Sequence, residues 1–240
     1  MTSTLVMLHG FMGDPADWAE VRAELTGFEI VTPRIEPADD WEQGVTRLLD
    51  ELPQQSVLIG YSMGARLALA CAVAAPQRCE ALVFVSGNPG LDTVARNSRY
   101  QHDLQVADRI EQEPRDEFLS RWYSQNVFSS LSAKMAREEI ERKLSQDGSQ
   151  WGDILRTYSI GQQPDFWPAL DELPFPILAV AGQHDKKYVD IMVRMSQWNH
   201  CEARIIPGAG HIVHREQPFV FIQILQAFLS RVVPTQQAHG

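Results

Sequence analysis

Residues 56–66 read SVLIGYSMGAR and contain the pattern G-x-S-x-G, with Ser62 at its centre. The residues before Gly60 form a short, mostly apolar run typical of a buried strand, and an apolar segment at helical spacing, Ala65–Ala75, follows. Glycines on both sides of Ser62 permit a tight turn and a close approach of strand and helix. The stretch therefore predicts a strand–turn–helix connection that exposes a reactive serine hydroxyl. The alternative is a serine that caps a helix beside ordinary turn glycines.

The same alternation of apolar runs and amphipathic segments extends over most of the 240 residues. Runs rich in Val, Ile and Leu are typical of parallel strands that are covered on both faces. The predicted strands are Thr4–Leu8, Glu29–Thr32, Ser56–Gly60, Ala81–Ser86, Ile177–Ala181 and Ala203–Ile206. The predicted helices are Asp17–Leu25, Trp41–Leu52, Met63–Ala75, Tyr188–Gln197 and Gln217–Val232. This order predicts an α/β fold with a mostly parallel central sheet flanked by helices.

Residues 88–174 depart from this alternation, because they contain no convincing strand. They contain instead four charged segments that favour helices, Ser98–Gln112, Arg115–Ser124, Ala133–Leu144 and Gln150–Ile160. We expect a helical lid, inserted before the penultimate strand, over a core formed by residues 1–87 and 175–240. The alternative is a set of additional packing helices. The polar tail from Pro234 to Gly240 is expected to fray.

A serine hydroxyl is a poor nucleophile near neutral pH and needs a neighbouring imidazole. The best candidate is His211, in a glycine-rich loop that directly follows the last predicted strand. The imidazole in turn needs a carboxylate to orient it. Asp185 follows the strand Ile177–Ala181 and so lies at the same edge of the sheet, while Asp190 is a rival on the next helix. Ser62, Asp185 and His211 therefore form the predicted catalytic triad.

Two further patterns concern the surroundings of this triad. His9-Gly10-Phe11-Met12-Gly13 follows the first strand, which nominates the backbone amides of Phe11 and Met63 as an oxyanion hole. His211 and His214 also form H-x-x-H, but no acidic or cysteine partner lies at ligand spacing, so we expect no metal. Four motifs, each directly after a predicted strand and in the chain order Ser, Asp, His, predict an α/β-hydrolase fold.

Composition limits the range of partners. The formal net charge of -10 disfavours nucleic acid and anionic membranes, although a few local arginines could still bind a small anion. The three cysteines form no C-x-x-C pair, no stretch is long and apolar enough to span a bilayer, and no secretory leader is evident. A cytoplasmic protein is expected. Arg66, in the first turn after Ser62, is a candidate ligand for a substrate carboxylate, or else a surface arginine.

Several segments make the chain resemble the 2-succinyl-6-hydroxy-2,4-cyclohexadiene-1-carboxylate synthase family of menaquinone biosynthesis. They are LHGF at residues 8–11, GYSMGAR at 60–66, GNPGL at 87–91, WYSQNVF at 122–128 and GHIVHRE at 210–216. The resemblance extends from Leu8 to about Phe228. It implies a lyase that eliminates pyruvate from 2-succinyl-5-enolpyruvyl-6-hydroxy-3-cyclohexene-1-carboxylate. In this reaction His211, oriented by Asp185, would activate Ser62 to remove a ring proton.

The resemblance also implies a set of substrate-binding residues and no cofactor. Arg66 and Arg99 match arginines that bind carboxylates, whereas Tyr61, Trp122 and Phe128 match aromatic residues that contact the substrate. For Trp122 and Phe128, packing within the lid is the alternative. A further family arginine falls at Lys143, so either Lys143 or the adjacent Arg142 takes its place. The expected partner is a small substrate with several carboxylates, bound by a monomer or weak homo-oligomer.

Two other functions remain open from the sequence. A serine carboxylesterase or thioesterase would use the same triad for acyl transfer, but an uncharged ester would not need Arg66, Arg99 and Lys143. A ligand-binding protein without catalytic activity could retain the fold, but an intact Ser62, Asp185 and His211 argues against it.

Overall fold

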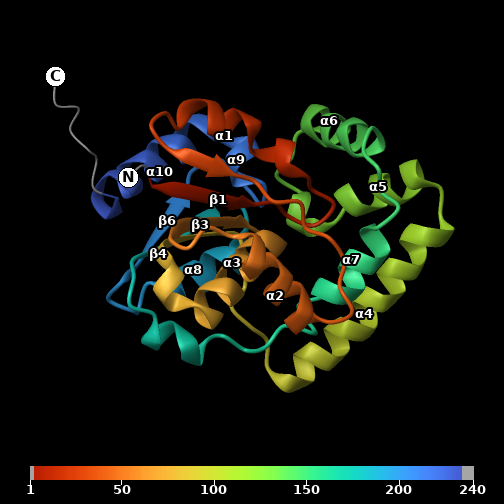
Figure 1. The fold of residues 1–240 in the computed structure, drawn as a ribbon. Helices are drawn as coiled ribbons and strands as arrows, with labels where there is room; N and C mark the ends of the chain where they lie inside the picture. Colours follow the sequence, from red (N-terminus) through yellow and green to blue (C-terminus); the bar gives the residue numbers. More distant parts are fainter. Residues whose placement is uncertain (1–2, 234–240) are drawn as a thin grey trace.

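The computed structural model describes residues 3–233, and its centre is a single sheet of six parallel strands (Figure 1). The strand order is β2-β1-β3-β4-β5-β6. The strands are β1 Thr4–Leu8, β2 Glu29–Val31, β3 Ser56–Tyr61, β4 Cys79–Val85, β5 Ile177–Gly182 and β6 Cys201–Ile206. All six predicted strands are confirmed, with ends that differ by no more than two residues. The predicted fraying of the tail from Pro234 lies outside the described residues.

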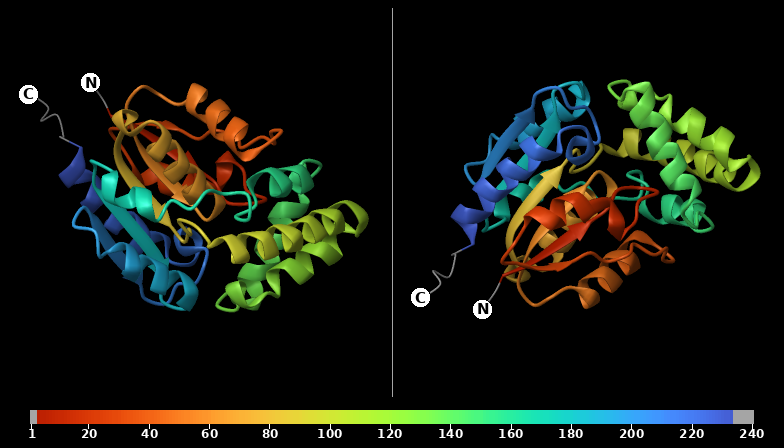
Figure 2. Two further views of the ribbon diagram at one scale, coloured as in Figure 1. Left: turned by 90° about the horizontal axis from the view of Figure 1, so that it is seen from below. Right: turned by 90° about the horizontal axis from the view of Figure 1, so that it is seen from above.

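Helices cover both faces of the sheet (Figures 1 and 2). One face packs against α2 Trp41–Glu51, α3 Met63–Ala74 and α8 Lys186–Met195, and the other packs against α1 Ala19–Glu24 and α10 Pro218–Val232. Successive side chains of a strand point to opposite faces, so Leu58 joins the first core and its neighbours Val57 and Ile59 join the second. This two-sided burial explains why the strands consist of nearly continuous apolar residues.

The segment between β4 and β5 contains helices and, within the described residues, no strand. Its helices are α4 Thr93–Gln112, α5 Arg115–Tyr123, α6 Ala133–Leu144 and α7 Trp151–Tyr158, with the 3-10 turn η3 Asn126–Phe128 between α5 and α6. They form a separate group beside the sheet (Figure 2). Phe118, Leu119 and Trp151 pack together there, and Met12 and Ile212 of the sheet-bearing part join the same cluster. The predicted helical insertion is thus confirmed, whereas the domain boundaries at 88 and 174 stay a prediction.

Three predicted helix starts were wrong, and two of them are explained by a capping side chain. The predicted helix Asp17–Leu25 is a 3-10 turn, η1 Pro15–Trp18, followed by α1, because the Asp14 side chain accepts a hydrogen bond from the Ala16 amide at 2.7 Å. Helix α4 begins at Thr93 instead of Ser98, since Asp92 caps it through the Ala95 amide at 2.9 Å. Helix α8 begins directly after Asp185, two residues earlier than predicted.

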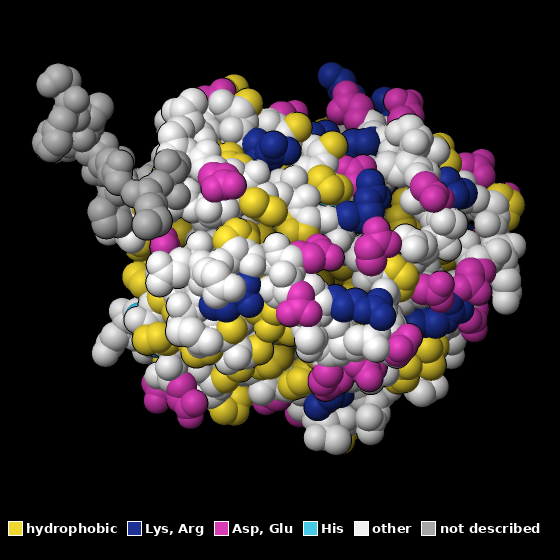
Figure 3. All heavy atoms as spheres, in the orientation of Figure 1, with side chains coloured by type: hydrophobic (Ala, Val, Ile, Leu, Met, Phe, Trp, Pro, Cys, Tyr) yellow, Lys and Arg dark blue, Asp and Glu magenta, His cyan; other side chains and the backbone are white. Residues whose placement is uncertain are grey.

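Two properties of the whole chain bear on its partners. Basic and acidic side chains lie interspersed on the face of the molecule drawn in Figure 3. Within residues 3–233, every helix is too short or too polar to span a bilayer.

Candidate active site

Ser62 occupies a strained turn between β3 and α3. Its backbone has φ 54° and ψ -109°, which a non-glycine residue adopts at a cost of about 1–3 kcal/mol. The Ser62 amide donates a hydrogen bond to Val85 O of the neighbouring strand β4 at 2.8 Å. A Cβ at Gly64 would overlap Leu8 O, and a Cβ at Gly60 would overlap the backbone of Gly64. Both glycines of the motif are therefore required by the close approach of β1, β3 and α3.

The structure brings the three residues of the predicted triad together. His211 Nδ1 donates to Asp185 Oδ2 at 2.6 Å, and His211 Nε2 accepts from Ser62 Oγ at 3.2 Å, an arrangement that fits the neutral tautomer with its proton on Nδ1. His211 is 5% exposed and Asp185 6% exposed. The rival carboxylate, Asp190, is exposed on α8. The geometry can thus transfer the proton of Ser62 to His211, while Asp185 stabilises the imidazolium.

The loop that carries His211 lies against the end of β5. A Cβ at Gly182 would overlap Gly210 O, so a larger residue would push this loop away from Asp185. Aromatic rings surround the imidazole, with ring centroids 4.8 Å away at Tyr188, 5.5 Å at Tyr61 and 5.9 Å at Phe128. These rings form apolar walls around the imidazole.

The predicted oxyanion hole lies in the turn after β1 and at the start of α3. His9 braces this turn, because its Nδ1 donates to Gly10 O at 2.9 Å and its Nε2 accepts from the Ile35 amide at 3.2 Å. Within residues 3–233, no acceptor is recorded for the amide of Phe11 or Met63. Both amides are therefore available to a ligand, and their catalytic role stays a prediction.

A cavity of about 620 Å³ lies between the sheet-bearing part and the helical insertion. This volume is typical of sites for small molecules. All the residues predicted for catalysis, the oxyanion hole and substrate binding line it, namely Phe11, Tyr61, Ser62, Met63, Arg66, Arg99, Trp122, Phe128, Lys143, Asp185 and His211. Phe128 also packs in the core of the insertion and Trp122 packs against it, so the packing interpretation is confirmed for these two side chains, whereas contact with a substrate stays a prediction.

Arg66 is a half-buried cation whose hydrogen-bond acceptors are uncharged groups. Its guanidinium donates to Tyr158 O at 2.8 Å and to Gln163 Oε1 at 3.1 Å, and no carboxylate within residues 3–233 pairs with it. Burial, together with the nearby Arg99, lowers the pKa of Arg66 to about 10. Arg99 differs, because its Nε donates to the buried Asp103 at 2.7 Å. A negatively charged ligand would supply the counter-charge that Arg66 lacks.

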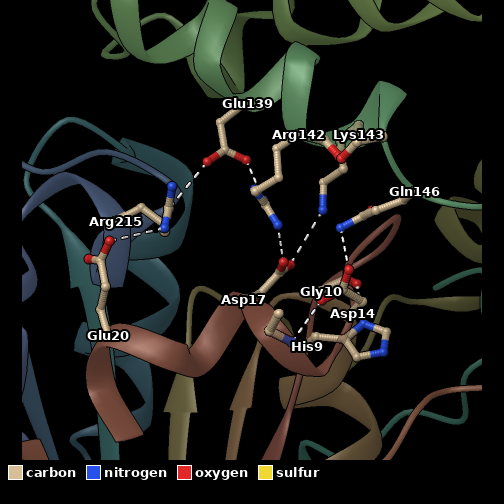
Figure 4. Close-up of polar contacts among 12 residues, drawn as sticks. His9, Gly10, Asp14, Asp17, Glu20, Glu139, Arg142, Lys143, Gln146 and Arg215 are labelled. Carbon is tan, nitrogen blue, oxygen red and sulfur yellow. Dashed lines mark hydrogen bonds and ion pairs between the residues drawn. The ribbon is translucent and has the colours of Figure 1, made fainter. Parts of the chain in front are cut away.

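Lys143 and Arg142, the two candidates for one family arginine, both bind Asp17 of η1 (Figure 4). Lys143 Nζ lies 3.4 Å from Asp17 Oδ2, and Arg142 also binds Glu139, which continues the network to Arg215 at 3.2 Å. Burial alone would raise the pKa of Asp17, but Lys143 and Arg142 together lower it below its ordinary value. Both cations line the cavity, and both are already neutralised in part by the same carboxylate.

Comparison with known proteins decides the family. A model of the alpha/beta hydrolase family matches residues 5–224. A protein of Enterobacter sp. (strain 638) named 2-succinyl-6-hydroxy-2,4-cyclohexadiene-1-carboxylate synthase is 32% identical over 227 residues, which cover 89% of this chain and 86% of that protein. The chain belongs to this synthase family. The predicted resemblance is thereby confirmed.

Solved structures agree with membership of the synthase family. The structure of MenH from S. aureus has a TM-score of 0.89 and 26% identity, covering 96% of this chain and 95% of the other. A thermophilic esterase from Thermogutta terrifontis has a TM-score of 0.78 and 22% identity, with 97% and 91% of the two chains covered. At that lower identity the likeness shows the fold alone, and the α/β-hydrolase fold is confirmed.

The cavity of this synthase-family chain also contains residues that the sequence analysis did not nominate. Lys187 and Tyr188 lie in the first turn of α8, shortly after Asp185 and the end of β5. Their closeness to Asp185 in the sequence could have identified them as candidates. His214 stacks on Trp18 with ring centroids 4.6 Å apart, and burial lowers its pKa to about 3. Within the described part of the chain, no third His, Cys, Asp or Glu completes a metal site with His211 and His214.

Proposed function

We propose that this protein is a carbon–oxygen lyase of menaquinone biosynthesis. It eliminates pyruvate from 2-succinyl-5-enolpyruvyl-6-hydroxy-3-cyclohexene-1-carboxylate and forms 2-succinyl-6-hydroxy-2,4-cyclohexadiene-1-carboxylate. Membership of the synthase family supports this reaction, and one observation on the site carries the choice of substrate. Arg66 places in the cavity that contains Ser62 a cation that pairs with no carboxylate of residues 3–233, which suits a substrate with several carboxylates. A cytoplasmic location is part of the proposal.

The reaction begins with proton transfer within the triad. His211 takes the proton of Ser62 Oγ, and Asp185 stabilises the resulting imidazolium through the 2.6 Å hydrogen bond to Nδ1. The Ser62 oxygen then removes the ring proton next to the succinyl carbonyl, and the electron pair of that C–H bond moves toward the carbonyl oxygen. Ser62 acts here as a base and forms no acyl-enzyme.

The enolate-like oxygen needs hydrogen-bond donors, because it gains negative charge in a site with little water. The amides of Phe11 and Met63 supply them, in the way an oxyanion hole stabilises a tetrahedral intermediate. Collapse of the enolate restores the carbonyl and forms a C2=C3 double bond. The existing ring double bond moves from C3=C4 to C4=C5, which breaks the bond from C5 to the enolpyruvyl oxygen, and this oxygen leaves with its electron pair. Protonation of the departing enolpyruvate by the His211 imidazolium, through Ser62 or water, completes pyruvate and restores the triad.

The test is a direct assay of pyruvate release, run beside a panel of p-nitrophenyl esters. The parent is expected to release pyruvate far faster than it cleaves any ester. Ser62→Ala should lower the elimination rate by roughly three to five orders of magnitude, whereas Ser230→Ala, at an exposed site on α10, should match the parent. Rapid ester turnover without pyruvate would establish the esterase alternative, and equal rates for Ser62→Ala and the parent would remove Ser62 from the mechanism.

A further inference from the structure

Glu216 contacts the His211 loop on both sides of the imidazole-bearing residue. It is the last residue of the short helix α9 Val213–Glu216, and its carboxylate turns back toward the loop. Oε2 accepts a hydrogen bond from the Gly210 amide at 2.8 Å, and Oε1 accepts one from the Ile212 amide at 2.9 Å. One carboxylate therefore binds the backbone amides of the two residues that flank His211, Gly210 and Ile212.

The same carboxylate also reaches the helical insertion. Ser130, which follows η3, donates from Oγ to Glu216 Oε2 at 2.8 Å. A Cβ at Gly210 would overlap Ser130 Oγ, so only glycine at position 210 allows this hydroxyl and the Gly210 amide to share one oxygen. The insertion and the His211 loop thus meet at one acceptor, Glu216 Oε2. Ser130 and Glu216 are 86 residues apart in the chain.

The contacts of Glu216 differ from those of an ordinary surface glutamate. Its neighbour Arg215 pairs with Glu139 and Glu20 instead, and within residues 3–233 no lysine or arginine pairs with Glu216. The charge of the carboxylate is satisfied by three neutral donors, two of them backbone amides. Hydrogen bonds to an ionised acceptor are stronger than those between neutral groups, so this arrangement suits the fixing of a backbone.

The geometry points to Glu216 as a positioning residue for His211, an inference that rests on the proposed function. The hydrogen bond from Ser62 Oγ to His211 Nε2 is 3.2 Å long, against 2.6 Å between His211 and Asp185, so a small displacement of the loop would break the first before the second. Proton transfer depends steeply on such distances. Glu216 holds the loop at the position where His211 reaches both partners, and Ser130 orients Glu216 from the insertion.

Glu216→Gln tests this role, because an amide keeps the size of the side chain but sets an NH2 group against one of the two loop amides. We expect kcat for pyruvate release to fall about 10- to 100-fold while KM stays within about threefold of the parent value. Glu138→Gln is the matched control, since Glu138 lies exposed on α6 and, within the described residues, pairs with Lys134 alone. This control should keep the kcat and KM of the parent.

A second measurement does not depend on the substrate. We expect the proton on His211 Nδ1, in its short hydrogen bond to Asp185, to give a low-field NMR resonance that is absent from His211→Gln. Glu216→Gln should shift or broaden this resonance at temperatures where its circular dichroism equals that of the parent, and Ser130→Ala should do so to a smaller extent. If the parent releases no pyruvate, the proposed function fails, but the resonance still tests the role of Glu216.

Two outcomes would overturn the inference. One is a folded Glu216→Gln protein with the kcat of the parent and an unchanged resonance. If Glu216→Gln does not fold, Glu216→Asp decides, because it keeps the carboxylate but shortens its reach to the two loop amides. A folded Glu216→Asp protein that matches the parent in both kcat and resonance would then reject the inference.

Discussion

Arg66 carries a positive charge beside the nucleophile, and the groups that hold it are a backbone carbonyl and a side-chain amide. Enclosing a cation without a counter-charge is unfavourable, which is why the pKa of Arg66 falls to about 10. An anion that binds beside Arg66 supplies the missing counter-charge. The residue therefore links the electrostatics of the cavity to the choice of substrate.

Replacing Arg66 by Met keeps much of the side-chain volume and removes the charge. The loss of a charge-assisted hydrogen bond to a substrate carboxylate is worth about 1.5–3 kcal/mol, so kcat/KM for pyruvate release should fall roughly 10- to 100-fold. Arg22→Met, on the exposed side of α1, serves as the control. A value of kcat/KM equal to that of the parent would show that Arg66 binds no substrate carboxylate.

The sequence predicts some residues of the site better than others, for a geometric reason. Ser62, Asp185 and His211 each follow a strand, and parallel strands bring their carboxyl ends to one edge, so topology alone places the three close together. Asp17 and Glu216 carry no such signal. Asp17 binds Arg142, which lies 125 residues away in the chain, and Glu216 binds Ser130 of the insertion besides two amides of its own loop, so these contacts depend on how the insertion packs on the rest of the molecule.

At the scale of elements, helix α6 is attached to the sheet-bearing part mainly through charges. Figure 4 shows Asp17 of η1 facing Arg142 and Lys143, with Glu139 between Arg142 and Arg215. The Lys143 side chain is only 3% exposed, so its charge depends on Asp17 for compensation. Burial lowers the pKa of Lys143, and Asp17 is the strongest influence in the opposite direction.

Asp17→Asn should therefore destabilise the protein. Removing one partner of a buried ion pair leaves the other charge uncompensated, at a cost of about 3 kcal/mol in the free energy of unfolding. Urea denaturation measures this change, and Lys143→Met completes a double-mutant cycle. The double variant should lose less than the sum of the two single losses, because the stranded cation is gone. Strict additivity, or an unchanged Asp17→Asn protein, would contradict a coupled pair.

Some helix boundaries depend on capping residues, which apolar periodicity does not reveal. Asp92 before Thr93 and Asp14 before Pro15 are both visible in the sequence as caps, yet apolar periodicity alone placed the two helix starts too late. The fold of the sheet did not suffer from these errors, because strand order depends on the apolar runs and their connections. Caps change where a helix begins, not which face it buries.

At the scale of the whole molecule, burial of histidines makes stability depend on pH. His214 is 3% exposed, stacks on Trp18 and has its pKa lowered from 6.5 to about 3, mainly by burial. Asp17 opposes this shift, whereas Arg215, Arg142 and His211 add to it. His9 is also buried, and burial lowers its pKa as well. Both imidazoles are therefore neutral in the folded protein at pH values where the unfolded chain already binds protons.

The stabilisation from His214 is complete above its unfolded pKa of 6.5 and is lost as the pH falls toward about 3. Between about pH 7.5 and about pH 5, this residue alone should lower the free energy of unfolding by about 2 kcal/mol. The pKa of Asp17 is also lowered. Protonation of Asp17 therefore reduces the stability only in more acidic solution, below the ordinary pKa range of a carboxyl group. Urea denaturation at the two pH values measures the difference.

His214→Phe keeps an aromatic ring beside Trp18 and should reduce the difference by about 2 kcal/mol, while His102→Gln, at an exposed position, serves as the control. A His214→Phe protein with the pH dependence of the parent would show that protonation of His214 does not cause this loss of stability.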